Sequence, residues 1–341
     1  MKFVYWFFTA AACVTIALLV AVIVILTVDS SDDDNPSTNI GRTVRFNNGR
    51  EYPIFGIGTA YTSLAEARES AMWAIDRGYR HIDTAYIYGT EVGVGEAVNA
   101  KIAQGVIARE DIFITSKLWK EFMEPQLVRS GLEITLSRLN LSHVDLYLIH
   151  WPMNSPESFA FDYLDTWRAM EELVDEGLIR SIGVSNFNGT QLDHIIDNAR
   201  IKPVVNQIES HPHCLNKRIK EHCRSRDVIV TAYSPLGTPG HPQFSPGDRL
   251  AINEPIIRAV AQKHQKTPAQ IMIRYQIQNG HIAIVKTNRN DRVITNFDVF
   301  DFNLSAEDVT EIESVDYFYR TSNEDSDIGH HQFPFETFEC L

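Results

Sequence analysis

Four side chains of complementary chemistry lie at or just after short apolar segments of this sequence. Asp83 and Tyr88 lie in GYRHIDTAYIYG, Lys117 lies in IFITSKLW and His150 lies in LYLIHWP. A phenol has a pKa near 10, but an adjacent ammonium lowers that pKa and a carboxylate keeps the ammonium charged. We therefore predict that Tyr88 is a general acid, activated by Lys117. Asp83 would hold Lys117, and His150 would orient a carbonyl oxygen by hydrogen bonding.

Acid catalysis at a carbonyl oxygen is useful when a hydride reaches the carbonyl carbon, so the sequence should also provide a cofactor site. Lys286, Arg289 and Arg292 lie around the predicted start of a helix in IAIVKTNRNDRVITNF. Cations and free helix N–H groups together form an anion site, and a 2′-phosphate suits it. The pattern therefore indicates NADP rather than NAD. Three further residues at strand ends are suited to contacts with a nicotinamide: Asn186, Gln207 and Tyr233.

The elements that must position these residues alternate along the chain. The apolar runs are 55–58, 80–83, 112–115, 144–149, 182–184, 204–208, 228–232 and 282–285. Helical periodicity covers 63–77, 91–104, 125–139, 161–176, 190–199, 216–225, 254–278 with a break near Thr267-Pro268, and 291–299. Alternating strands and helices predict a parallel sheet. Eight units in about 280 residues predict an α/β fold, a closed (β/α)8 TIM barrel whose active groups lie at the carboxyl ends of the strands.

Two further patterns support this fold. TVRFNNGREYPI alternates around Asn48-Gly49 and predicts an N-terminal β-hairpin before the barrel. An open doubly wound sheet would need a glycine-rich turn directly after its first strand. The candidate, Gly93-Val94-Gly95, lies inside a helical stretch, so we interpret it as a close-packed helix surface and reject the open sheet.

The sequence resembles the aldo-keto reductase family from about Arg45 to Phe335. The matching motifs are GYRHIDTAYIYGTEVGVGEAV, TSKLW, DLYLIHWP, GVSNF, NQIESHP, AYSPLG and KTNRNDRVITNF, followed by HHQFPF near the end. The resemblance implies reversible, NADPH-dependent reduction of an aldehyde or ketone to the alcohol. It also implies that the four residues named first form the catalytic tetrad.

The resemblance assigns further contacts. For the nicotinamide it implies Ser185, Asn186, Gln207 and Tyr233; for the pyrophosphate Ser234 and Leu236; for the adenosine phosphate end Lys286, Thr287, Arg292 and Asn296; and Gly58 and Thr59 also as cofactor contacts. An apolar substrate wall would be formed by Ile87, Trp119 and Trp151. Thr295 stands where many members have a glutamate facing adenine, and Ala60 where aldose reductase has a tryptophan. The physiological carbonyl compound is not encoded in a recognisable pattern.

The N-terminal region predicts a membrane anchor. No charged residue occurs from Phe3 to Val28, an apolar run of about 26 positions where about 20 suffice to span a bilayer. We predict a single transmembrane helix over 3–28, an acidic flexible tether over 29–39 and the barrel over 40–341. A cleaved signal peptide is the alternative, although its apolar core is shorter. The side of the membrane stays open, because the three sequons, Asn140-Leu141-Ser142, Asn188-Gly189-Thr190 and Asn303-Leu304-Ser305, are usable only in a lumenal domain.

Composition limits the partners. A net charge of -13 argues against nucleic acid, which attracts basic surfaces. We expect a small carbonyl substrate, a lipid bilayer as the partner of the N-terminal segment and a monomeric catalytic domain. The four cysteines do not form a disulfide framework and are expected to be free thiols.

Two alternatives to a metal-free reductase remain. His211, His213, Cys214, His222 and Cys223 suggest zinc, but their spacing fits no standard ligand set, so we expect no metal. The second alternative is a nucleotide-binding module with little turnover, similar to the β subunits of voltage-gated potassium channels, or a tethered pseudoenzyme. The complete tetrad favours the enzyme.

Overall fold

Eight parallel strands close into a barrel in the order β10-β3-β4-β5-β6-β7-β8-β9. In chain order they are β3 (Phe55–Gly58), β4 (His81–Asp83), β5 (Phe113–Leu118), β6 (Leu146–Ile149), β7 (Ile182–Ser185), β8 (Val205–Glu209), β9 (Ile229–Tyr233) and β10 (Ile282–Lys286). The predicted (β/α)8 barrel is therefore confirmed, with strand bounds within a few residues of the expected ones.

The computed structural model describes residues 42–154, 162–239, 249–322, 324 and 327–335. The predicted anchor, 3–28, and the tether, 29–39, lie outside these residues. Within the described ranges, no helix combines the length and the apolar character that crossing a bilayer requires.

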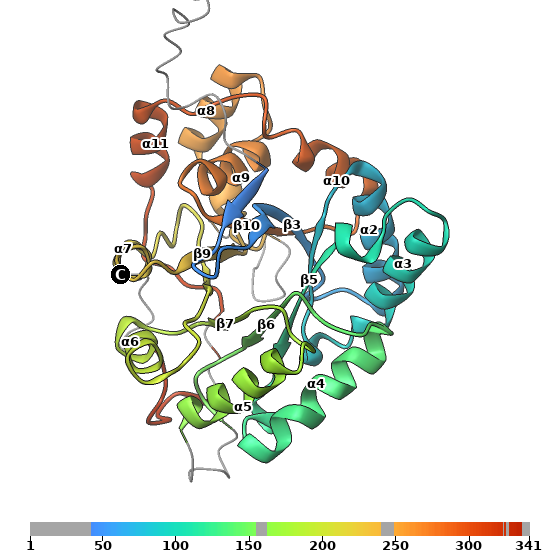
Figure 1. Cartoon of the computed structure of the whole chain (residues 1–341). Helices are drawn as coiled ribbons and strands as arrows, with labels where there is room; N and C mark the ends of the chain where they lie inside the picture. The colour runs from blue at the N-terminus through green and yellow to red at the C-terminus, as the bar shows by residue number, and fades with distance from the viewer. Residues whose placement is uncertain (1–41, 155–161, 240–248, 323, 325–326, 336–341) are drawn as a thin grey trace, which may run out of the picture. The chain divides into compact units, whose positions relative to one another are not determined.

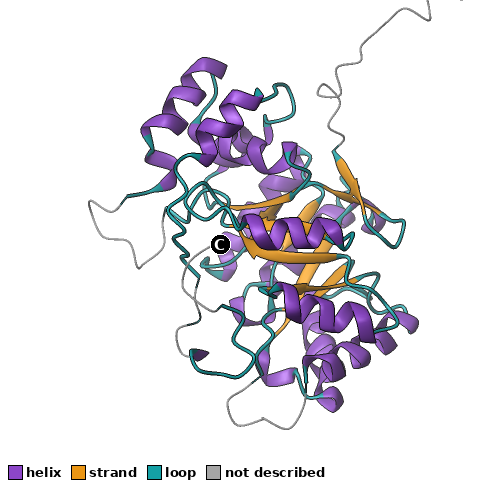
Figure 2. Ribbon diagram, turned by 90° about the vertical axis from the view of Figure 1, so that its left-hand side faces the viewer, coloured by secondary structure: helices purple, strands orange, loops and turns teal. Residues whose placement is uncertain are grey.

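Helices lie outside the strands, with α2 beside α3 and α8 beside α9 (Figure 1). They are α2 (Leu64–Arg77), α3 (Glu91–Ala103), α4 (Pro125–Leu139), α5 (Tyr163–Asp175), α6 (Gly189–Asn198), α7 (Lys217–Ser225), α8 (Pro255–His264), α9 (Pro268–Gln278), α10 (Asn290–Phe297) and α11 (Ala306–Glu313). Short 3₁₀ turns are η1 (Tyr86–Tyr88), η2 (Arg109–Asp111), η3 (Lys120–Phe122) and η4 (Ala251–Asn253). Figure 2 shows the strands at the centre of this arrangement.

Local sequence sets several helix ends. Thr267 caps α9 in a capping box with Gln270, and Pro268 occupies the first turn. This confirms the break expected near Thr267-Pro268. Helix α11 was not predicted, although the side chain of Ser305 caps it by accepting from the Asp308 amide.

The glycines of α3 allow close packing between helices, as the sequence indicated. A Cβ at Gly93 would collide with the carbonyl of Leu64, and a Cβ at Gly95 with that of Leu139. Helix α3 therefore packs closely against the N-terminus of α2 and the C-terminus of α4, and the Gly93–Gly95 pair serves packing.

An N-terminal hairpin covers the end of the barrel at which the strands begin. Strand β1 (Thr43–Arg45) pairs antiparallel with β2 (Glu51–Pro53). The Asn47 amide donates to the carbonyl of Pro203 at 2.8 Å, just before β8, and the Tyr52 ring meets Phe113 edge-on at 4.5 Å. Because the hairpin covers this end, a ligand site must lie at the opposite end, where the strands finish.

The expectation of free thiols is wrong for Cys214, which is disulfide-bonded. Cys223 is a free, buried thiol on α7, and burial raises its pKa to about 12.

Candidate active site

Three adjacent strands bring the predicted catalytic residues to one end of the barrel. Asp83 is the last residue of β4, Lys117 lies near the end of β5, and His150 directly follows β6. Tyr88 ends the 3₁₀ turn that follows β4. The order β4-β5-β6 in the barrel makes these strand ends neighbours.

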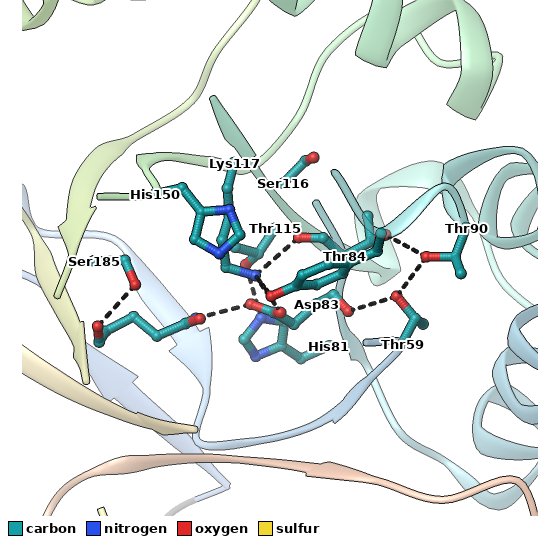
Figure 3. A network of polar contacts seen from close by, with 12 residues as sticks. Thr59, His81, Asp83, Thr84, Thr90, Thr115, Ser116, Lys117, His150 and Ser185 are labelled. Carbon is teal, nitrogen blue, oxygen red and sulfur yellow. Dashed lines mark hydrogen bonds and ion pairs between the residues drawn. The ribbon is translucent and has the colours of Figure 1, made fainter. Parts of the chain in front are cut away.

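The Lys117 ammonium is the centre of the site. It donates to Asp83 Oδ1 at 2.5 Å and to the Thr84 carbonyl at 2.9 Å, and it lies 3.4 Å from the Tyr88 hydroxyl. Figure 3 shows Lys117, Asp83 and His150 directed toward the same space. The Lys117 side chain is 0 % exposed, so its charge depends on the buried ion pair with Asp83.

Burial changes the acidity of this cluster. It lowers the pKa of Lys117, while the Asp83 charge acts in the opposite direction. Burial and the Asp83 charge raise the pKa of Tyr88 well above its ordinary value. The lowering of the phenol pKa that the sequence predicts is therefore absent. Tyr88 is protonated at neutral pH, which is the state that a general acid requires.

His150 is held as a neutral imidazole. Burial, together with the charges of Lys117 and Lys120, lowers its pKa well below the ordinary value. The Tyr88 and His150 rings meet edge-on with centroids 5.6 Å apart. His150 Nδ1 is buried without a hydrogen-bond partner in the described part of the chain. A neutral imidazole offers one N–H to a carbonyl oxygen beside the phenol.

The residues expected at the nicotinamide lie on the next three strands. Gln207 donates to Asp83 Oδ2 at 2.8 Å, which joins this group to the catalytic residues. Ser185 donates to the Gln207 carbonyl at 2.9 Å, and Tyr233 donates to Asn186 Oδ1 at 2.9 Å. Asn186 has a positive φ of 63°, a backbone conformation that is uncommon outside glycine and concentrates at functional sites.

These residues fit a nicotinamide. A carboxamide offers one acceptor and two donors, and the buried hydroxyl of Ser185 with the amides of Asn186 and Gln207 provides matching groups of both kinds. Tyr233 is half-buried and offers an aromatic face. Ser234, which follows β9, also has a positive φ, 50°, while Leu236 is half-buried beyond it.

Gly58 and Thr59 support the site from β3. The Thr59 amide and hydroxyl both donate to the Asp83 carbonyl, at 3.1 Å and 3.2 Å. Gly58 pairs with Asp83 on one side and Lys286 on the other. A Cβ at Gly58 would lie 3.0 Å from Ile284 Cγ2, so glycine permits this close packing.

The expected phosphate site lies at the end of β10 and the start of α10. Lys286 and Arg292 are exposed, whereas Thr287 and Asn296 are buried. Arg289 forms an ion pair with Asp291 at 2.7 Å. Among the described residues, no ion pair uses Lys286 or Arg292, so these two cations remain for a phosphate.

Aromatic rings surround the space in front of His150. The Trp119 ring meets His150 edge-on at 5.1 Å, and buried Trp151 meets Phe335 at 6.0 Å. Ile87 is 46 % exposed on the 3₁₀ turn that carries Tyr88. Phe335 of the C-terminal segment adds an aromatic ring to this region, and the apolar wall formed by Ile87, Trp119 and Trp151 stays a prediction.

Sequence reasoning missed two contacts that hold the C-terminal segment. The Lys120 ammonium, after β5, binds Glu324 at 2.7 Å and also pairs with Asp327. Glu209, at the end of β8, accepts hydrogen bonds from the amides of Thr321 at 2.8 Å and Ser322 at 3.0 Å. A buried carboxylate at a strand end was the available signal for Glu209.

Glu209 also lies beside two of the residues considered for zinc. Glu209, His211 and Cys214 offer ligand atoms within 4.8 Å of one another. Burial opposes ionisation, but hydrogen bonds and charges, chiefly from His211, lower the pKa of Glu209 to about 2. Since Cys214 is disulfide-bonded and Glu209 binds the C-terminal segment, these groups already have structural partners.

The other candidate zinc ligands are dispersed. His213 binds Glu254 at 2.8 Å, and His222 binds Asp193 at 3.0 Å. Cys223 accepts from the Asn206 amide at 3.8 Å. Hydrogen bonding accounts for each of these side chains without a shared metal.

A protonated phenol and a neutral imidazole beside a buried lysine–aspartate pair define a barrel oxidoreductase that acts on carbonyl groups. Comparisons with known proteins agree. Residues 54–317 match the model of the Aldo/keto reductase family. The chain is 43% identical over 287 residues to Aldo-keto reductase family 1 member A1-A of Danio rerio, covering 80% of this chain and 89% of that protein. It is 40% identical over 312 residues to Aldo-keto reductase family 1 member C3 of Homo sapiens, covering 86% and 97%.

A solved structure of similar fold supports the same conclusion. The aldo-keto reductase of Bombyx mori in complex with NADP matches with a TM-score of 0.81 and 37% identity, covering 86% of this chain and 98% of that one. The chain therefore belongs to the aldo/keto reductase family. It is an NADP-dependent oxidoreductase.

Proposed function

We propose that Tyr88, Lys117, Asp83 and His150 carry out the NADPH-dependent reduction of an aldehyde or ketone. The observation that supports this most directly is the buried Lys117–Asp83 ion pair within 3.4 Å of the Tyr88 hydroxyl. When bound, NADPH supplies the hydride that reaches the carbonyl carbon. The protein must then provide a proton for the carbonyl oxygen and stabilise the charge that develops there.

Each residue has one part in this chemistry. The His150 N–H orients the carbonyl oxygen toward Tyr88, and Tyr88 donates its proton as negative charge grows on that oxygen. The Lys117 ammonium stabilises the developing phenolate. Asp83 keeps the ammonium in place and charged, and the reverse sequence oxidises an alcohol.

We place the cofactor across the carboxyl ends of β7 to β10. Ser185, Asn186 and Gln207 would hold the carboxamide and Tyr233 the ring face. Ser234 and Leu236 would follow the pyrophosphate, with Gly58 and Thr59 on the side of β3. At the far end, Lys286, Thr287, Arg292 and Asn296 would hold the adenosine phosphate, because two exposed cations lie there beside a helix N-terminus.

An apolar carbonyl compound suits the mouth of the barrel. Trp119, Trp151, Ile87 and Phe335 present aromatic and aliphatic surface around His150. Relatives of similar length include a Prostaglandin-E(2) 9-reductase of Oryctolagus cuniculus, 41% identical over 312 residues. A bulky lipophilic carbonyl is therefore a better candidate than a sugar.

The function is tested by replacing the proposed acid. NADPH binding is followed by fluorescence and turnover by NADPH oxidation with 4-nitrobenzaldehyde. Tyr88→Phe should bind NADPH normally but lose roughly 10²- to 10⁴-fold in kcat, the range of one proton-transfer catalyst. Tyr86→Phe is the matched control, because Tyr86 lies on the same turn and packs against Phe122 instead of facing Lys117.

Two outcomes would contradict the proposal. An unchanged rate in Tyr88→Phe would exclude the acid assignment. Nucleotide binding without turnover of any carbonyl by the unmodified protein would favour a binding module instead.

We also propose that the apolar run 3–28 anchors the protein to a bilayer and that the catalytic domain acts as a monomer. The uninterrupted apolar length of the run supports the anchor. Carbonate extraction of membranes should leave the full chain in the pellet, and a chain starting at residue 40 should be released and sediment as one copy. Release of the full chain by carbonate would contradict the anchor.

A further inference from the structure

The disulfide at Cys214 requires a partner among the other three cysteines. Cys214 lies buried in the loop after β8. The chain has four cysteines, and Cys223 is a free thiol, which leaves Cys13 and Cys340. Both lie outside the described residues, so the choice depends on the described segments that lead to them.

A series of contacts connects Cys214 to the C-terminal segment. The Asn216 amide lies 3.5 Å from Cys214 Sγ, and Arg320 donates to Asn216 Oδ1 at 3.1 Å. The Arg320 guanidinium lies over the Phe335 ring, 3.7 Å from its centroid. From Phe335, the five residues to Cys340 can extend at most about 17 Å.

Cys13 is separated from the first described residue, Arg42, by 28 positions of sequence, whereas Cys340 is separated from Phe335 by four. Cys340 belongs to the same unit as Cys214 and follows directly on a segment whose last described residues contact the neighbourhood of Cys214. The geometry therefore favours Cys340.

A stable disulfide indicates an oxidising compartment, because cytosolic thiols are kept reduced. The three sequons provide an independent check on this, since asparagine-linked glycans are added only in such a compartment. The three sequons differ in the contacts that their asparagine side chains make in the structure.

Asn140 is the sequon asparagine that is free to carry a glycan. It ends α4, is exposed, and its side-chain amide takes part in none of the hydrogen bonds among the described residues. Ser142, which completes the sequon, is exposed too. Asparagine-linked glycans are bulky and lie on surfaces, as this position requires.

The other two sequons are engaged in the fold. Asn188 caps α6 by accepting from the Gln191 amide at 2.9 Å, and it donates to the Pro334 carbonyl at 3.0 Å. Asn303 accepts from the Arg274 guanidinium. A glycan at either position would compete with these contacts, so neither is a suitable acceptor.

We propose that the barrel lies in the oxidising lumen of the secretory pathway, where Cys214 pairs with Cys340 and Asn140 carries an N-linked glycan. The pairing is a thiol–disulfide exchange: two thiols reduce the disulfide of a dithiol oxidoreductase to two thiols, and the new S–S bond forms. In glycan transfer, Asn140 Nδ2 bonds to the anomeric carbon of a lipid-linked oligosaccharide. Nδ2 loses one proton, and the lipid diphosphate leaves.

Mass spectrometry of the full chain from cultured eukaryotic cells tests both modifications. Free thiols are blocked with N-ethylmaleimide before lysis, and the protein is digested without reduction. The expected result is a Cys214 peptide linked to a Cys340 peptide, with Cys223 unlinked. Removal of N-glycans by an amidase should convert Asn140 to aspartate and increase the gel mobility in one step.

Variants separate the parts of the proposal. Asn140→Gln should abolish the amidase-sensitive shift, while Asn303→Gln and Asn188→Gln should leave it intact. Cys340→Ser should leave Cys214 open to alkylation, whereas Cys223→Ser should leave the linked peptide unchanged. An unglycosylated chain whose cysteines are all alkylated would overturn the proposal, as would a Cys214–Cys13 link or a glycan at Asn188 or Asn303. None of these readouts depends on catalysis.

Discussion

The two ends of the proposed cofactor site hold their charges in different ways. At the catalytic end, Lys117 is fully buried and paired with Asp83. At the phosphate end, Lys286 and Arg292 are exposed. Water and salt screen exposed charges, whereas buried charges act at nearly full strength. The catalytic end should therefore determine turnover and stability, and the phosphate end only the affinity for the nucleotide.

The largest effect is expected from breaking the buried pair. Lys117→Met would leave the Asp83 carboxylate buried with Gln207 as its remaining side-chain donor. Removing one partner of a buried ion pair costs about 3–5 kcal/mol of unfolding free energy. Turnover should fall as well, because the phenolate loses its ammonium. Urea unfolding and NADPH oxidation measure the two effects.

A double variant sharpens this prediction. Asp83→Asn combined with Lys117→Met removes both charges, so the double variant should be more stable than Lys117→Met alone. Its turnover should remain low. Removing both charges restores stability, but it does not restore the Lys117 ammonium that stabilises the phenolate. A double variant no more stable than the single one would show that the pair does not behave as a buried ion pair.

A smaller, purely binding effect is expected at the phosphate end. Arg292→Ala should weaken NADPH binding roughly tenfold through the loss of a charged phosphate contact, with kcat unchanged at saturation. Binding of NADH, which lacks the 2′-phosphate, should change little. Arg289→Ala is the matched control, because Arg289 already pairs with Asp291. Equal losses for NADPH and NADH would contradict the phosphate assignment.

The last effect concerns pH. His81 is buried at the start of β4, and burial lowers its pKa to about 4 from an ordinary value near 6.5. Between these values the unfolded state binds more protons, so the unfolding free energy should fall by about 3 kcal/mol as the pH decreases from 6.5 to 4. Urea unfolding at several pH values measures this.

Other groups also titrate between pH 4 and 6.5, so the contribution of His81 is isolated by comparing variants. His81→Gln can keep a hydrogen bond to Thr115, which His81 meets at 2.9 Å. This variant should lose less stability on acidification than the unmodified protein. His331→Gln, at an exposed position, should behave as the unmodified protein does. Identical pH dependence in all three would exclude His81 as a contributor.

Much of the site followed from the sequence because parallel strands finish at the same end of a barrel. Asp83, Lys117 and His150 each end or follow an apolar run, so a shared location could be predicted without coordinates. Lys120 could not be found in this way. Its partner Asp327 lies far along the chain and after the last helix, and no local pattern connects the two.

The acidity of Tyr88 likewise could not be predicted from the sequence. From the sequence, an adjacent ammonium should lower the phenol pKa, and the ammonium is indeed beside it. Burial, together with the charge of Asp83, nevertheless raises that pKa. The disulfide at Cys214 was likewise missed, since cysteine spacing contains no information on which thiols meet.

The amino-acid sequence alone determined the alternation of strands and helices, and with it the end of the barrel at which the catalytic side chains gather. It did so because apolar periodicity and helix caps act over a few residues. Only the tertiary structure decided which of those groups are buried, how they are paired and what their pKa values become. Desolvation and ion pairing depend on every segment that covers a group, and those segments are distant in the sequence.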